Sequence, residues 1–322
     1  MSSSGRRSYI FLLDYLGLAL VLLLLILVFG LFTENFFTLT NFRTIVNQTP
    51  DAVVIAVGMT FVLIIAGIDL SVGSVLGLSA AVLAVCVHRF EWPLMAAVAA
   101  CLATGLLCGM LNGVTTITWR LPSFIVTLGM LEIARGGAYL VTDSRSIYIG
   151  TTIGDIAAMR VGGVSLMFVM ALLVVVVGQV MLSLTAFGRH LFSVGANEEA
   201  ARLSGIPTQR LKAAVFALSG LLAGLAALIH AARLEGVNPE DGVGYELQAI
   251  AAVVIGGTSL FGGRGSVIRS FLGVMIIAVL AGGLAQANAQ EHTKRLVTGL
   301  VIVAAVIIDY YRNRLRASRA AE

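Results

Sequence analysis

The polar residues best placed to do chemistry in this chain lie inside long apolar stretches. Asp69 sits in the segment A-G-I-D-L-S-V-G-S at 66–74, with no cation near it in the sequence. Glycines on both sides allow the backbone to leave the helical conformation. The Asp69 and Ser71 side chains can then hydrogen-bond the backbone groups that an unwound segment leaves free. An interrupted helix with polar contents is typical of a translocation path, so we expect Asp69 to lie on one.

A second interruption is predicted at 255–267, where the sequence is I-G-G-T-S-L-F-G-G-R-G-S-V. Five glycines within this segment disfavour a helix that lacks tertiary support, because glycine is a poor helix former. Thr258 is the polar side chain that we expect to contribute to a path here.

A third candidate lies between two apolar stretches, in the polar segment at about 186–211. Asn197 is a suitable N-cap, Glu198 and Glu199 suit a first turn, and Gly205 followed by Pro207 suits a stop. These residues predict a short two-turn helix. A helix of this length is marginal by itself, so we expect it to dock on a partner.

The remaining charged residues predict ordinary structural roles. Asp51 follows Thr49-Pro50, which is typical of a helix start. Glu132 and Arg135 are spaced to neutralise each other on one helix, and this pair is equally compatible with a structural role and with a place on the transport path. The four histidines, at 88, 190, 230 and 292, are expected to be solvated or interfacial. We therefore expect no metal site among them, since no H-E-x-x-H motif is present.

The motifs of soluble enzymes are missing from the sequence. It contains no G-x-x-x-x-G-K-[ST], and its two lysines, Lys212 and Lys294, do not follow a glycine. No G-x-S-x-G occurs, and Cys86, Cys101 and Cys108 lack C-x-x-C spacing. We therefore expect a chain that is not an enzyme, needs no cofactor and cannot hydrolyse ATP by itself.

Composition places these segments in a membrane. Of the 322 residues, 58% are apolar and only 12% are charged, whereas soluble proteins are about a quarter charged. The net charge of +4 is too small for a nucleic-acid binder. Apolar stretches of about 20 residues predict membrane-spanning helices at 12–32, 51–67, 71–88, 94–114, 122–141, 164–184, 212–231, 246–260, 269–287 and 295–310. The predicted fold is an all-α polytopic membrane protein, one integral domain over 1–322 with about ten spans.

The distribution of Lys and Arg predicts the orientation. Arg6-Arg7 before an apolar run is similar to a signal peptide, but no small-x-small cleavage site follows, so an uncleaved first helix is expected. When both termini are placed in the cytoplasm, most Lys and Arg residues fall on the cytoplasmic side, as the positive-inside rule requires.

Four segments carry a family resemblance, namely G-M-T-F-V-L-I-I-A-G-I-D-L-S-V-G-S at 58–74, L-P-S-F-I-V-T-L-G-M at 121–130, G-A-N-E-E-A-A-R-L-S-G-I at 195–206 and A-I-A-A-V-V-I-G-G-T-S-L-F-G-G-R-G-S at 249–266. The chain resembles the permease subunit of bacterial ABC importers for monosaccharides, of the ribose/xylose/galactose type. That branch belongs to the superfamily that includes branched-chain amino-acid permeases.

The resemblance implies a coupling helix that seats on an ATP-binding subunit. Its residues would be Gly195, Asn197, Glu198, Ala201, Arg202, Gly205 and Ile206. The implied partners are two ATP-binding subunits, a periplasmic sugar-binding protein and a second permease copy or similar chain, in the bacterial inner membrane. Because specificity would lie mainly in the binding protein, the path needs only weak polar contacts. The expected path residues are Asp69, Ser71, Asn112, Thr127 and Thr258.

Three alternatives stay open on the sequence. A branched-chain amino-acid permease of the same family differs only in substrate. An ion-coupled secondary transporter would use a proton- or sodium-linked carboxylate and no ATPase. An integral-membrane enzyme would form product without ATP, although the chain has no cluster of intramembrane acids to support that chemistry.

Overall fold

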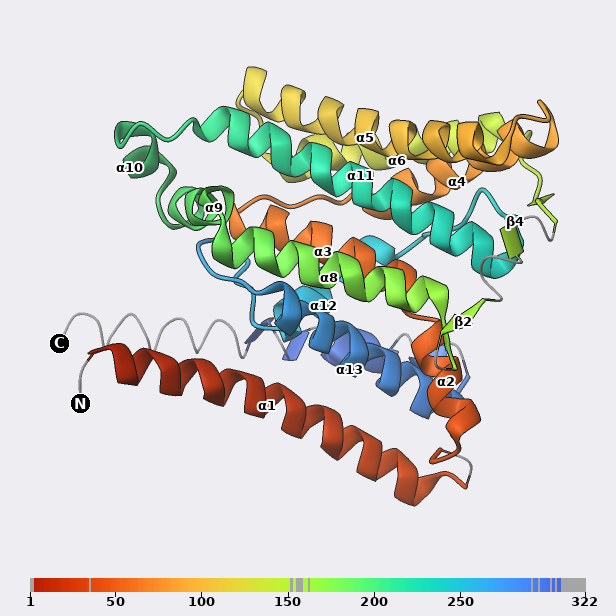
Figure 1. The fold of residues 1–322 in the computed structure, drawn as a ribbon, viewed down its shortest axis with the longest axis horizontal. Coiled ribbons are helices and arrows are strands. Elements are labelled where there is room, and N and C mark those ends of the chain that lie inside the picture. The colour runs from red at the N-terminus through yellow and green to blue at the C-terminus, as the bar shows by residue number, and fades with distance from the viewer. Residues whose placement is uncertain are drawn as a thin grey trace.

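The structure is a computed structural model that describes residues 3–34, 36–150, 153–154, 159–161, 163–290, 292–294, 296–301, 303–304 and 306–307. Helices dominate these residues, and the long ones run in roughly the same direction across the molecule (Figure 1). The prediction of an all-α polytopic membrane protein is confirmed at this level.

Six helices are long and apolar enough to cross a membrane. They are α1 (Ser3–Phe32), α5 (Leu94–Thr118), α6 (Ser123–Val141), α8 (Leu166–Leu184), α11 (Thr208–Leu234) and α13 (Val267–Gln286). A seventh crossing is formed if α2 (Leu39–Asn47) and α3 (Pro50–Ile64), which meet at a bend of 46°, count as one broken span.

The predicted number of about ten spans is not confirmed. Two of the predicted spans correspond to shorter helices, α4 (Val72–His88) and α12 (Tyr245–Ile255), which have 17 and 11 residues. Helix α12 ends at Ile255, where the glycine-rich segment begins at Gly256, and this is why it is shorter than the predicted span 246–260. Helix α4 covers all but one residue of its predicted range, 71–88. The tenth predicted span, 295–310, lies partly outside the described residues.

The two ends of the helix bundle are built differently. At one end lie α9 (Ala186–Ala196) and α10 (Glu198–Leu203), the same end at which α1 begins (Figure 1). At the other end lie two short antiparallel ladders. One pairs β1 (Ile147–Tyr148) with β4 (Gly236–Val237), and the other pairs β2 (Arg160–Val161) with β3 (Val164–Ser165).

The core of the bundle is formed around α3 and α11. Nearly every side chain of α3 is buried, as expected for a helix that is apolar on all sides. Helix α11 packs against α3, α4 and α5. A Cβ atom on Gly105 of α5 would overlap the Gly220 carbonyl oxygen of α11, so small residues let these two backbones approach closely.

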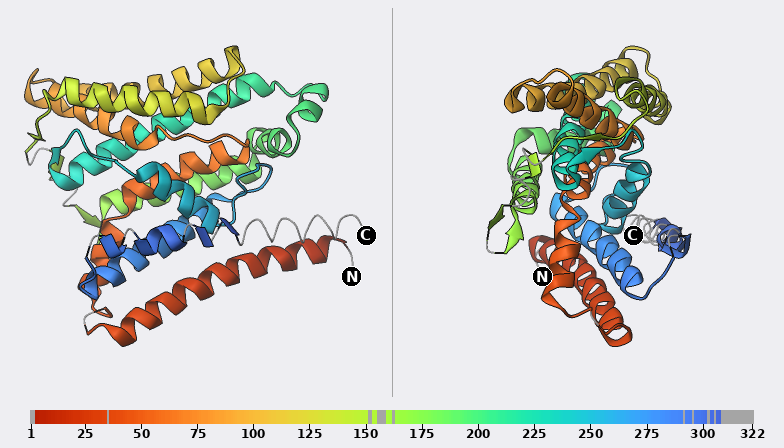
Figure 2. Two further views of the ribbon diagram at one scale, coloured as in Figure 1. Left: turned by 180° about the vertical axis from the view of Figure 1, so that it is seen from behind. Right: turned by 90° about the vertical axis from the view of Figure 1, so that its right-hand side faces the viewer.

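Helix α1 lies at the edge of the bundle and packs against α13 (Figure 2). Its Leu20, Leu24 and Leu31 are exposed, and so are large apolar side chains of α5, α6 and α8. An apolar surface of this extent fits contact with lipid rather than with water.

Candidate functional site

The first predicted interruption is present in the structure. Helix α3 ends at Ile64 and α4 begins at Val72, and Ala66 between them has a positive φ of 58°. Hydroxyl groups of α6 accept the backbone N–H hydrogen bonds that a continuous helix would have satisfied within itself. The Ser123 hydroxyl accepts from the Ile68 N–H at 3.0 Å, and the Thr127 hydroxyl accepts from the Leu70 N–H at 3.0 Å.

Asp69 is the centre of a buried hydrogen-bonded group in this segment. Its Oδ1 accepts from the Ser71 hydroxyl at 2.6 Å and from the Ser71 N–H at 3.0 Å. Its Oδ2 accepts from the Ser219 hydroxyl of α11 at 2.9 Å. Asn112 of α5 donates from Nδ2 to the Ser71 Oγ at 2.9 Å. We call Asp69, Ser71, Asn112, Thr127 and Ser219 the inner cluster.

The structure thus brings together four of the five expected path residues. All of them are buried, and both Asp69 carboxylate oxygens are already hydrogen-bonded. The Asn112 Oδ1 has no partner among the described residues. Ser219 and Ser123 were missed, because a serine within an apolar helix gives no sequence signal of a partner about 150 and 55 residues away.

Thr258, the fifth expected path residue, belongs to a different group. Its Oγ1 lies 3.5 Å from the Ser270 Oγ, and the Thr60 hydroxyl is hydrogen-bonded to the same Ser270 Oγ at 2.8 Å. This buried group ties the turn after α12 to α3 and α13. The 256–266 segment is non-helical, as predicted.

The short polar helix is present with the predicted ends. The Asn197 side chain accepts from the Ala200 N–H at 2.9 Å and caps α10. Gly205 has a φ of +83°, and the Ile206 N–H bonds back to the Ala201 carbonyl oxygen at 3.1 Å. The positive φ explains the glycine, since residues with a Cβ rarely adopt it.

Charged side chains lie on the surface of α10. Glu198 forms an ion pair with Lys212 at the start of α11. Arg202 lies 2.5 Å from Glu199, and this hydrogen-bonded guanidinium lowers the pKa of the Glu199 carboxyl. Leu203 is 78% exposed at the C-terminal end of the helix. The helix therefore presents a mixed polar and apolar surface away from the bundle.

Helix α9 was not predicted, since its residues belong to the polar segment in which only the two-turn helix is expected. Thr185 caps it, and Leu191 and Val194, three residues apart, form its buried face. This spacing was the available signal. Gly195 lies in α9, where a Cβ atom would overlap the Ile64 carbonyl oxygen and crowd the Gly263 N–H. That N–H donates to the same Ile64 oxygen at 2.8 Å, so α9, the end of α3 and the 256–266 turn meet at one point.

A second buried acid lies at the opposite end of α3. The Asp51 Oδ2 lies 2.7 Å from His230 Nδ1, and it accepts from Arg233 Nη2 at 2.9 Å and from the Tyr245 hydroxyl at 3.3 Å. His230 Nε2 lies 3.5 Å from the Asp241 Oδ1. We call Asp51, His230, Arg233, Asp241 and Tyr245 the outer cluster.

The outer cluster confirms one expectation and corrects another. Asp51 stands in the first turn of α3 after Pro50, as predicted, and it is buried beside His230 and Arg233. His230 is buried rather than solvated. Arg135 also differs from its prediction, because its Nη1 donates to the carbonyl oxygens of Pro239 and Asp241 at 2.6 and 2.8 Å instead of pairing with Glu132.

Comparison with known proteins gives the chain a family. The family described as branched-chain amino acid transport system / permease component matches residues 41–306. The chain belongs to this permease family.

Curated relatives of the permease carry the names of sugar importers. The ribose import permease protein RbsC of Escherichia coli strain K12 is 39% identical over 313 residues, which are 95% of this chain and 97% of that protein. The Haemophilus influenzae protein of the same name is 39% identical over 91% of this chain and 92% of its own length. The fructose import permease protein FrcC of Rhizobium meliloti is 33% identical over 92% of this chain and 86% of its own. No solved structure matches the chain.

Proposed function

We propose that this permease is the transmembrane subunit of an ATP-driven importer that carries a monosaccharide delivered by a periplasmic binding protein. The observation that carries the proposal is 39% identity to a ribose import permease over 95% of the chain. The fructose relative supports a sugar as well. Since these relatives are named for sugars, the branched-chain amino-acid alternative is not favoured.

The proposed assembly follows from the two ends of the bundle. The end with α9 and α10 faces the cytoplasm, where α10 and its flanking residues Gly195 to Ile206 seat on an ATP-binding subunit. Both termini lie on this side of the bacterial inner membrane. A second permease copy or a similar chain completes the pair, and α4, α12 and the 295–310 segment complete about ten passages within one integral domain.

A mechanical route links the docking helix to the membrane interior. Movement of α10 displaces α9, and Gly195 transmits the displacement to Ile64 and Gly263 because their backbones are in direct contact. Ile64 leads directly into the segment that holds Asp69. The inner cluster acts as a joint there, since its hydrogen bonds connect α4, α5, α6 and α11.

Reconstitution tests the proposed function. The permease is placed in liposomes with the ATP-binding subunit and sugar-binding protein of the same organism, and uptake of labelled D-ribose and D-fructose is measured. We expect accumulation that requires ATP and both partners. Uptake driven by a proton gradient without ATP, or uptake of leucine and of neither sugar, would contradict the proposal.

The variant Gly205→Val tests the coupling role. A Cβ-branched residue opposes the φ of +83° at this position, so the end of α10 is redirected while the membrane helices stay intact. We expect normal abundance in the membrane, with sugar-stimulated ATP hydrolysis and uptake falling together by about tenfold or more, which corresponds to about 1.4 kcal/mol of lost coupling. Glu198→Gln is the milder comparison because its ion pair with Lys212 is partly exposed to solvent. Unchanged ATP hydrolysis and uptake in Gly205→Val would mean that α10 is a solvated element with no role in coupling.

A further inference from the structure

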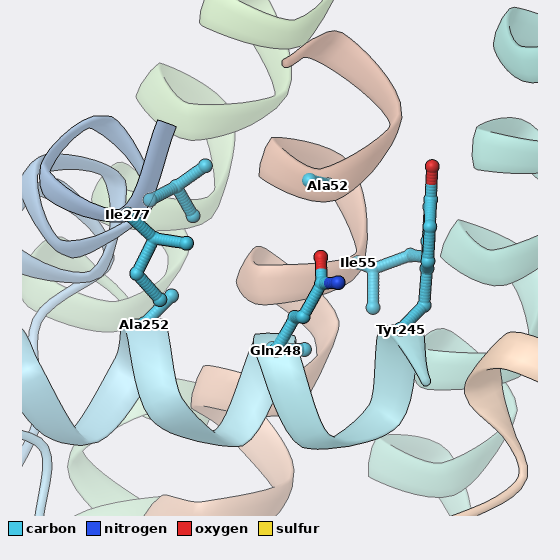
Figure 3. A pocket seen from close by; sticks show the side chains of 8 residues that line it. Ala52, Ile55, Tyr245, Gln248, Ala252 and Ile277 are labelled. Carbon is cyan, nitrogen blue, oxygen red and sulfur yellow. The ribbon is translucent and has the colours of Figure 1, made fainter. Parts of the chain in front are cut away.

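A cavity of about 620 Å³ opens between α2, α3, α12 and α13. It lies toward the end of the bundle that carries α2 (Figure 1). A smaller pocket of about 30 Å³ shares Ala52, Tyr245, Gln248, Val274 and Ile277 with it. Figure 3 shows Gln248 and Tyr245 projecting from the same helix, α12, into this smaller pocket. The larger volume falls in the usual range of small-molecule sites, about 300–1,000 Å³.

The lining of this cavity is amphipathic. Gln48 and Gln248 are exposed, and neither amide group has a hydrogen-bond partner among the described residues. Each side-chain amide therefore offers an NH2 group that can donate two hydrogen bonds and a carbonyl oxygen that can accept them. Ala52, Val274 and Ile277 supply an apolar wall.

Tyr245 is held in place at the edge of the cavity. Its hydroxyl donates to the Asp51 Oδ2 at 3.3 Å, and its ring meets the His230 ring edge-on at a centroid distance of 5.9 Å. Because both contacts fix the ring, the side that borders the cavity is a rigid apolar surface.

We propose that this cavity is the monosaccharide subsite of the transport path, in which the Gln48 and Gln248 amides bind sugar hydroxyls and the Tyr245 ring covers a C–H face. The inference rests on the proposed function and adds the place of binding. The inner cluster is less suitable as a sugar site, since both Asp69 oxygens are already engaged by protein donors.

The charge of the lining disfavours a free amino acid as the ligand. Among the described residues that line the cavity, Lys294 is the one charged group. A free amino acid would need partners for an ammonium and a carboxylate together, and the described lining supplies no carboxylate for the ammonium. Two neutral amides also bind weakly enough to release a transported sugar.

The test uses the complete reconstituted importer, with D-ribose and D-fructose as probes. Gln48→Ala and Gln248→Ala each remove one amide. Gln290→Ala is the matched control, because Gln290 is an exposed glutamine that does not line the cavity. We expect each cavity variant to lower uptake at subsaturating sugar by about tenfold, the usual effect of losing one or two hydrogen bonds, and the control to stay within about twofold of the wild type.

A second readout separates the subsite from a folding defect. We expect all three variants to reach the membrane at wild-type abundance, so that lost uptake in the cavity variants reports lost sugar binding. In Gln248→Cys, we expect a small methanethiosulfonate reagent to block uptake and excess D-ribose to slow the block. The native thiols of Cys86, Cys101 and Cys108 are buried, so the wild type is the control for this reaction.

The two proposals fail in different ways. If the wild-type complex takes up both sugars while Gln48→Ala, Gln248→Ala and the modified Gln248→Cys match the Gln290→Ala control, the subsite is overturned and the proposed function stands. If the wild-type complex takes up neither sugar but transports leucine, the proposed function is overturned, and the sugar subsite with it.

Discussion

Two buried aspartates, Asp69 and Asp51, belong to the same stretch of chain and are stabilised in opposite ways. Asp69 accepts hydrogen bonds from the Ser71 hydroxyl and N–H and from the Ser219 hydroxyl, and no described Lys, Arg or His lies within ion-pair distance of it. Asp51, at the other end of α3, lies beside His230 and Arg233.

The difference shows what each carboxylate contributes. At the inner cluster, the acceptor capacity of Asp69 matters more than its charge, because neutral groups are all that it binds. At the outer cluster, the negative charge of Asp51 compensates buried positive charge. Substitutions that remove charge but keep shape should therefore separate the two clusters.

The largest effect is expected for Asp51→Asn. The substitution leaves Arg233 and His230 beside a neutral amide, and removing one member of a buried ion pair typically costs about 3–5 kcal/mol. The measurement is the free energy of unfolding in detergent, or the melting temperature when unfolding is irreversible. If Asp51→Asn is as stable as the wild type, charge compensation has no role in the outer cluster.

A somewhat smaller loss, about 3 kcal/mol, is expected for Asp69→Leu. Leucine leaves the Ser71 N–H, the Ser71 hydroxyl and the Ser219 hydroxyl without their acceptor. Each buried donor left unsatisfied costs about 1–3 kcal/mol, and this cost falls where a hydroxyl can rotate to donate to a backbone carbonyl oxygen instead. We expect reduced thermal stability and reduced uptake in the same preparation. Normal uptake by this variant would remove the inner cluster from the proposed route of coupling.

Asp69→Asn should cost much less, about 1 kcal/mol. The asparagine Oδ1 can still accept from Ser71, and the Ser219 hydroxyl can rotate to accept from the new amide. The same melting assay and uptake assay apply. The comparison between the two aspartates fails if Asp69→Asn is as damaging as Asp51→Asn.

The smallest effect is expected for Asp143→Asn, which serves as the exposed reference. Asp143 lies 3.3 Å from Arg89, and its side chain is 68% exposed. Water and salt screen such a pair, so no measurable change in melting temperature is expected. A clear loss of stability here would mean that carboxylate removal destabilises the permease wherever it is made.

Local features were predictable from the sequence, and long-range ones were not. The interruption at Asp69, the cap at Asn197 and the positive φ at Gly205 are encoded by neighbouring residues, and all three are present. The proximity of Asp51 and His230 joins residues 179 positions apart, and composition gives no sign of it. Thr258 resembled a path residue by its glycine-rich surroundings, yet tertiary packing places it with Thr60 and Ser270.

The cavity was missed for a related reason. Gln48 and Gln248 lie 200 residues apart, and each lies at a helix end where other polar residues are common, so neither stands out in the sequence. Only the packing of α2, α3, α12 and α13 makes them neighbours of one space. The pattern of apolar and polar residues along a helix predicts which side chains face a core. It does not predict where neighbouring helices leave an unfilled space between each other.

Helix α12 is short for a membrane passage. Its 11 residues amount to about 16 Å of helix, roughly half of a hydrocarbon core about 30 Å thick. The 256–266 turn that follows it packs against the end of α3 and against α9 at Gly195. If α12 is one of the proposed passages, this turn spans the remaining depth, and the resting permease then depends on its close backbone packing to resist the leak of protons and ions.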